Sequence, residues 1–158
     1  ANACLNDLSN ITVLNNAVGD SEESVFIPEP NLSSSTVNHG DTSIDNRSNG
    51  QQVKLIAIDS LELPKIKFLK LDVQGCELRA LKGAKQLILR DKPCFIVEIE
   101  SWQLKKFNCS PEDLIQFIKT ELNYDIYQMM TKYPADFLCV PKDSKVNLNF
   151  KTFELKKV

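Results

Sequence analysis

Two apolar runs on either side of a helical stretch constrain the fold of this chain more than any other feature. Ile66–Val73 and Cys94–Ile99 are short, mostly apolar runs, which is typical of strands buried on both faces of a sheet. Between them, Cys76–Arg90 carries apolar residues at helical spacing, and Lys92-Pro93 ends that pattern. A strand–helix–strand unit of this kind predicts two parallel strands with a helix packed across them.

The end of the chain predicts a reversal of the sheet. The last two predicted strands, Tyr124–Met130 and Asp136–Val140, are separated by only five residues, 131–135. A parallel connection needs about a dozen residues or more, so these two strands must form an antiparallel hairpin. Before them, Ser110-Pro111 is a strong helix start, with Ser as N-cap and Pro at the first helical position. The predicted fold class is therefore α/β: a Rossmann-like three-layer sandwich whose mostly parallel sheet ends in one antiparallel strand.

The first half of the chain has weaker patterns. We predict a helix end at Ala1–Leu8 with Leu5 and Leu8 buried, a strand at Ile11–Asn15, a loop insertion at 20–52 that contains the short strand Ser24–Ile27, and a strand at Val53–Ile58. Residues 1–143 are then one domain, and 144–158 form a C-terminal tail.

Charge and cysteine usage exclude several classes of partner. Nineteen basic and 21 acidic residues give a net charge of −2, which provides no footprint for nucleic acid or an anionic membrane. No apolar run approaches the ~18–20 residues that span a bilayer. The five cysteines are scattered and never form a C-x-x-C pair. This favours reduced thiols in a cytoplasmic protein over a disulfide framework or a metal site. The N-x-S/T sequons are expected by chance in a chain so rich in Asn and Ser.

A set of short motifs between Leu55 and Glu100 carries a family resemblance. The motifs are Ile58-Asp59-Ser60-Leu61, the run FLKLDVQGCE at 68–77, Leu81-Lys82-Gly83-Ala84, Lys92-Pro93 and Val97-Glu98-Ile99. Together they resemble the FkbM methyltransferase family, and Asn16–Asp20 resembles the turn after that family's third strand. One position departs from the family pattern, because Gln74 stands where the family usually has Glu.

The resemblance implies a function and a cofactor. It implies an S-adenosylmethionine-dependent methyltransferase that methylates a hydroxyl of a small molecule or glycan. The family's Gly-rich turn and its ribose-binding acid hold the cofactor, but no Gly-x-Gly occurs in this sequence. By the resemblance both elements lie before Ala1, so we expect this chain to be a fragment that carries strands three to seven. The alternative is a non-catalytic Rossmann-like half-domain that serves packing or protein interaction.

Candidate site residues cluster at the carboxyl ends of the two predicted parallel strands, where ligands bind in open α/β sheets. Lys70, Asp72 and Glu98 are the catalytic candidates, with Asp72 near the sulfonium and the acceptor hydroxyl and Glu98 able to accept that hydroxyl's proton. Alternatively, Lys70 forms an ion pair with Asp72, Glu77 or Glu98 that only orders the strand end, and Glu98 is a solvated strand end.

The resemblance also suggests cofactor contacts elsewhere. Ala17, Val18 and Gly19, together with Asp72, are the expected cofactor-binding residues, through backbone groups and a small wall for the adenine ring. Glu77 is expected to have a structural role in the first turn of a helix. The single histidine, His39, has no second ligand nearby, so no transition-metal site is expected. Trp102 is expected either to line an acceptor pocket or to cap the core.

Overall fold

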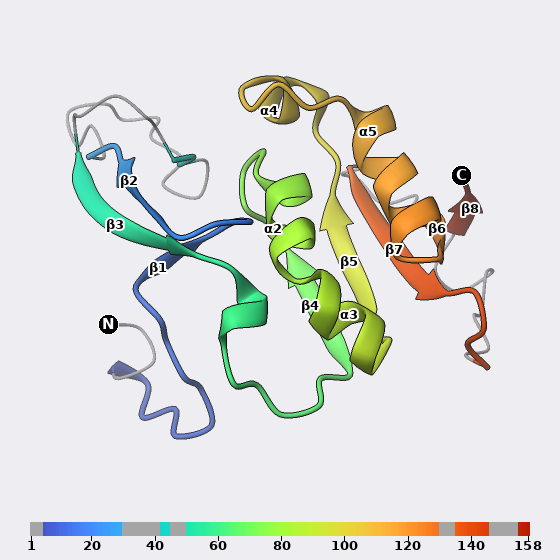
Figure 1. Cartoon of the computed structure of the whole chain (residues 1–158), viewed down its shortest axis with the longest axis horizontal. Coiled ribbons are helices and arrows are strands. Elements are labelled where there is room, and N and C mark those ends of the chain that lie inside the picture. The colour runs from blue at the N-terminus through green and yellow to red at the C-terminus, as the bar shows by residue number, and fades with distance from the viewer. Residues whose placement is uncertain (1–4, 30–41, 45–49, 130–134, 146–154) are drawn as a thin grey trace.

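The computed structural model describes residues 5–29, 42–44, 50–129, 135–145 and 155–158 of the chain. His39, most of the predicted loop insertion and the link at 131–134 lie outside these ranges. The described strands form two sheets, with helices packed against the larger one (Figure 1). The small sheet contains β1 (Asn16–Val18), β2 (Glu23–Ile27) and β3 (Gln51–Ile56) in the order β1-β3-β2.

The large sheet follows in the second half of the chain. Its strands are β4 (Phe68–Leu71), β5 (Cys94–Glu98), β6 (Tyr124–Met129), β7 (Asp136–Pro141) and β8 (Leu155–Lys157), in the order β4-β5-β7-β6-β8. The helical elements are the 3₁₀ turn η1 (Ile58–Ser60), α2 (Glu77–Gly83), α3 (Lys85–Asp91), α4 (Ser101–Lys105), α5 (Pro111–Gln116) and the π-helical turn η2 (Phe117–Glu121).

The pairing of strands confirms two predictions and corrects a third. β4 and β5 are parallel, and β6 and β7 form the predicted antiparallel hairpin. The expectation of a mostly parallel sheet was wrong, because only β1–β3 and β4–β5 are parallel among the described pairings. The reason is that β7 inserts between β5 and β6 and runs against both. In addition, the predicted C-terminal tail contributes β8, which pairs antiparallel with β6.

Strand β4 is shorter and more exposed than the sequence predicted. Only Phe68–Leu71 of the predicted strand Ile66–Val73 is extended and paired, and Phe68 is 54% exposed. The prediction of a strand buried on both faces was wrong here. Among the described strands, β4 has a neighbour on one side only and therefore lies at an edge of the sheet.

The apolar core lies between one face of the large sheet and its helices. Phe95 and Val97 are fully buried on that face, and α2, α3 and α5 lie in front of it in Figure 1. Successive residues of a strand point to opposite faces, so Ile96 and Glu98 lie on the other face, where both are half-buried. The described residues thus form two layers, and the third layer of the predicted sandwich is not seen among them.

The predicted helix Cys76–Arg90 is divided in two at Ala84, which ends α2 and precedes α3. The division has a packing reason at Gly83. A Cβ atom there would lie 1.8 Å from the carbonyl oxygen of Gly19 and 3.3 Å from the Cα of Ala57. Only glycine permits so close an approach, so Gly83 lets the end of α2 rest on the small sheet.

Two helix starts are fixed by side-chain caps. Ser110 and Asp113 form a reciprocal capping box at the start of α5, as the sequence predicted. Asp59 of η1 caps α3, because its carboxylate oxygens accept hydrogen bonds from the backbone N–H groups of Gln86 (2.9 Å) and Leu87 (2.8 Å).

The N-terminal predictions were wrong in part. The strand predicted at Ile11–Asn15 has no strand partner, and β1 begins only at Asn16. Leu5 and Leu8, which were expected to be buried, are 79% and 45% exposed, and the residues of the predicted strand are similarly open to solvent. Their sequence has an apolar pattern, but these side chains are not buried by the described residues, and a pattern alone cannot supply a packing partner.

Candidate functional site

The two parallel strands end side by side and bring the predicted catalytic residues together. Leu71 of β4 is in register with Val97 of β5, so Asp72 and Glu98 follow at adjacent strand ends. The antiparallel strand β7 begins at the same place, with Asp136 directly opposite Glu98. Lys70 lies on the same face of the sheet as Glu98, and these four residues, Lys70, Asp72, Glu98 and Asp136, are called here the charged rim.

Asp72 is held by neighbours on both of its carboxylate oxygens. The ammonium group of Lys70 donates to Oδ2 (2.9 Å) and the side-chain amide of Gln74 donates to Oδ1 (3.0 Å). The hydrogen bond from Lys70 lowers the pKa of Asp72, partly opposed by burial, and the same bond raises the pKa of Lys70. Lys70 therefore forms the ion pair with Asp72 that was one of its predicted alternatives. Because both side chains are exposed, the pair alone is worth only about 0–1 kcal/mol.

Glu98 has the opposite electrostatic environment. Burial raises its pKa to about 7, and the negative charges of Asp72, Glu77, Glu100 and Asp136 act in the same direction. A carboxylate with a pKa near neutrality exists in both protonation states at physiological pH, which suits a group that accepts a proton and later releases it. Glu100 is half-buried just beyond β5.

The predicted cofactor residues Ala17, Val18 and Gly19 lie at the other end of α2 from the charged rim. Gly19 packs against Gly83 at the C-terminal end of that helix, and its N–H donates to the carbonyl oxygen of Ile56 (3.0 Å). This N–H is therefore already used within the small sheet. That Ala17–Gly19 bind a cofactor stays a prediction.

Glu77 has the structural role that the sequence indicated. It is 2% exposed, and its Oε1 atom accepts hydrogen bonds from the backbone N–H groups of Val73 (3.2 Å) and Gly75 (3.1 Å). Burial raises its pKa, and those backbone hydrogen bonds oppose the rise. Glu77 thus supports the turn that follows Asp72 from inside the protein.

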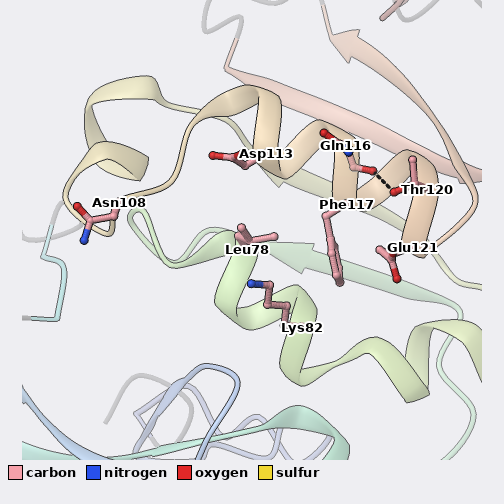
Figure 2. A pocket seen from close by; sticks show the side chains of 8 residues that line it. All are labelled: Leu78, Lys82, Asn108, Asp113, Gln116, Phe117, Thr120 and Glu121. Atoms are coloured by element: carbon pink, nitrogen blue, oxygen red, sulfur yellow. Dashed lines mark hydrogen bonds between the residues drawn. The ribbon is translucent and has the colours of Figure 1, made fainter.

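Two hollows formed by described residues lie away from the charged rim. The larger, about 490 Å³, lies between α2 and the continuous helix α5–η2 (Figure 2). Its lining residues are Leu78, Lys82, Asn108, Asp113, Gln116, Phe117, Thr120 and Glu121. The smaller, about 330 Å³, lies beside η1 and α3. Both therefore open on the helical side, whereas Lys70 and Glu98 occupy the opposite face of the large sheet.

Three further residues near the charged rim were missed or left open by the sequence. Asp136 could have been found, because a reversed strand begins at the edge of the sheet where the strands running the other way end. Gln103, buried on α4 and donating its side-chain amide to Gln74, gives no signal in the sequence. Trp102 does not cap the core, since it is 51% exposed with the Lys106 ammonium 4.3 Å from its ring centre.

Comparisons with known proteins decide the family. The family model described as "Methyltransferase FkbM domain" matches residues 2–126. The chain belongs to the FkbM methyltransferase family. A crystal structure of the methyltransferase FkbM from Methylobacillus flagellatus KT has the same fold, with a TM-score of 0.53 and 19% sequence identity. The match covers 86% of this chain and 31% of that one, so the chain spans about a third of the related protein's length. No curated protein matches.

The structure gives two of the motifs that resemble the FkbM family a physical role. In this chain, the Asp of the first motif caps α3, and Gly83 permits the contact with Gly19. Among the described residues, no three His, Cys, Asp or Glu side chains gather closely enough to hold a metal ion. Within the same residues, every helix is too short or too polar to cross a membrane.

Proposed function

We propose that this FkbM chain is the acceptor-activating part of an S-adenosylmethionine-dependent methyltransferase that methylates a hydroxyl group of a sugar or small metabolite. The family match supports methyl transfer in general. The observation that carries the more specific proposal is the pair of carboxylates at the charged rim, with the pKa of Asp72 lowered and that of Glu98 raised to about 7. Environments that separate two carboxyl groups in this way assign them different roles.

The described residues fit one end of the cofactor. S-adenosylmethionine supplies a methyl group on a positively charged sulfonium, and the negative charge of Asp72, Glu98 and Asp136 suits a cation at the rim. Asp72, held ionised by Lys70, is the residue that would face the sulfonium. The two hollows described above lie away from the rim.

The reaction needs alignment and the removal of one proton. Glu98 accepts the proton of the acceptor hydroxyl as that oxygen forms a bond to the methyl carbon. The cofactor would supply that methyl group, and the electron pair of the broken C–S bond would remain on its sulfur as a neutral thioether. Because Glu98 is half-buried, its ionised form is poorly hydrated and therefore more basic than a surface carboxylate. Asp72 remains ionised throughout. Trp102 is exposed on the helix that follows β5, and we propose that it contacts the acceptor.

The test is methyl transfer as a function of pH. The assay uses the longest natural form of the protein, because this chain corresponds to 31% of the related crystal structure. We expect the rate to rise with pH and to level off above about 7, where Glu98 is ionised. Glu98→Gln and Asp72→Asn should each lower the rate by about 10²-fold or more, and Glu98→Gln should also remove the pH dependence. Glu112→Gln, on the exposed face of α5, is the matched control.

A second candidate function is a half-domain that binds another protein. It is favoured by the exposed apolar residues of the N-terminal segment, including Leu5, Ile11 and Val13. Wild-type turnover in both rim variants would contradict the roles given to Asp72 and Glu98, whereas the absence of methyl transfer in the wild-type protein would favour this second function.

A further inference from the structure

The turn after β4 has an unusual backbone for its sequence. Gln74 has a φ of 53° and Gly75 a φ of 101°. Glycine enters this left-handed region freely, but a long side chain such as glutamine does so at a cost, and such residues persist only where their surroundings hold them. The surroundings of Gln74 therefore indicate what the turn is built to fix.

Contacts hold this turn from two directions. From inside, the buried carboxylate of Glu77 accepts the N–H groups of Val73 and Gly75. From α4, the buried side chain of Gln103 donates to the Oε1 atom of Gln74. Helix α4 also approaches closely enough that a Cβ on Gly75 would lie 2.5 Å from the carbonyl oxygen of Gln103. The side chain of Gln74 thus has a defined position, with its oxygen occupied.

The remaining group of Gln74 reaches Asp72. Its Nε2 atom donates to Oδ1 of Asp72 at 3.0 Å, while Lys70 occupies Oδ2 at 2.9 Å. We propose that Gln74 is a positioning residue whose amide links Gln103 of α4 to Asp72 and holds that carboxylate in place as a fixed anion at the charged rim. This inference rests on the proposed function and deepens it, because it names a residue that acts with Lys70 to hold the carboxylate of Asp72 in place.

The side-chain amide of Gln74 matters because most of the charged groups around Asp72 are acidic. Glu77 lies close to Asp72 from inside the protein. The other acidic neighbours are Glu98 at the end of β5, Glu100 just after it, and Asp136 at the start of β7. Lys70 is the neighbouring cation at this end of β4. A carboxylate at position 74 would face Asp72 with like charge. An amide instead donates a hydrogen bond, so in this chain Asp72 keeps its charge and Glu98 is left as the proton acceptor.

The test is a carboxyl titration of the 158-residue chain by NMR, without cofactor or acceptor. In the wild type, the pKa of Asp72 should lie below its ordinary value of 3.8, and the side-chain amide protons of Gln74 should shift with the same midpoint. Q74M keeps a similar shape but removes both the donor to Asp72 and the acceptor for Gln103, and it should raise the pKa of Asp72 by about 0.5. Q74E adds a like charge and should raise that pKa by about 1 or more. Q51M, at an exposed position in β3, should leave it unchanged.

Two results would overturn the inference. The first is a Gln74 side chain in the wild type whose amide protons ignore the titration of Asp72. The second is an unchanged pKa of Asp72 in both Q74M and Q74E. If a variant fails to fold, the wild-type titration alone decides. Because no methyl transfer is measured, failure here is distinct from failure of the proposed function, which the activity of Glu98→Gln tests separately.

Discussion

The large and small sheets are built from strands of similar length, yet they differ in what lies beneath them. Seventeen described side chains form the buried core between the large sheet and its helices, whereas only Val25, Val53 and Leu55 are buried under the small one. Apolar burial is the main favourable contribution to folding and is roughly proportional to area. The small sheet therefore depends on its attachment to α2, through Gly83 and Arg79, more than on a core of its own.

The largest expected effect concerns the cofactor. If the small sheet completed a cofactor site by itself, the 158-residue chain would bind S-adenosylmethionine with micromolar affinity. We expect negligible binding, on the order of millimolar or weaker, because losing a few contacts to charged groups costs several powers of ten. The sequence has no Gly-x-Gly turn, and the N–H of Gly19 is engaged with Ile56. Isothermal titration of the purified chain is the measurement, and micromolar binding would contradict this reading of the small sheet.

Substitution of Gly83 should disrupt the contact between α2 and the small sheet. Gly83→Ala places a methyl group 1.8 Å from the carbonyl oxygen of Gly19, so either α2 or the small sheet must move. We expect a loss of about 3 kcal/mol in the free energy of unfolding, at the upper end for overpacking. Urea denaturation measures the loss, with exposed Lys82→Ala as control.

Hydrogen exchange would show where the Gly83→Ala variant opens. Amides of β1, β2 and β3 should lose protection, while those of β5 and β7 keep it. An equal loss of amide protection in both sheets would mean that the small sheet does not open independently of the large one.

The smallest effect is electrostatic. Arg79 of α2 forms ion pairs with Asp20 (2.8 Å) and with Glu23, and Arg79→Met should cost about 1 kcal/mol, less at high salt. Lys54→Met, which removes a more exposed ion pair with Glu22 on the same sheet, is the matched control and should cost less.

The contribution of Arg79 should also depend on pH in one direction. The hydrogen bond from Arg79 lowers the pKa of Glu23, so the stabilisation is present above the ordinary value of 4.5 and is lost as the pH falls through the lowered one. Denaturation of wild type and Arg79→Met across this range measures it. A difference between them that stays constant would show that Arg79 acts by packing alone.

The same contrast explains which predictions from the sequence held. The hairpin β6–β7, the parallel pair β4–β5 and the start of α5 were predicted, because a short link, a buried run or a cap determines each locally. Ile11–Asn15 failed because its apolar pattern requires a partner that the described residues do not supply. Gly83 and Gln103 contact residues that are far away in the sequence, and no local sequence pattern predicts such contacts.

The candidate site divides in the same way. Asp72 and Glu98 were placed at adjacent strand ends by the topology of parallel strands, and the structure has them there. The separation of their pKa values depends on burial, on Lys70 and on the charge of Asp136, which is known only when the strands are assembled. Gln74 was visible as a departure from the family pattern, but its link to Gln103 was not.

Helix α2 has a mechanical consequence for the molecule. Its first residue, Glu77, supports the turn that carries Asp72, and its last, Gly83, rests on the backbone of Gly19. Seven residues of helix span on the order of 10 Å, which is too short to bend appreciably. A helix of this length moves nearly as a rigid body. A ligand that shifted the backbone of Gly19 would therefore push on the last residue of α2, and the first residue of that helix supports the turn that carries Asp72.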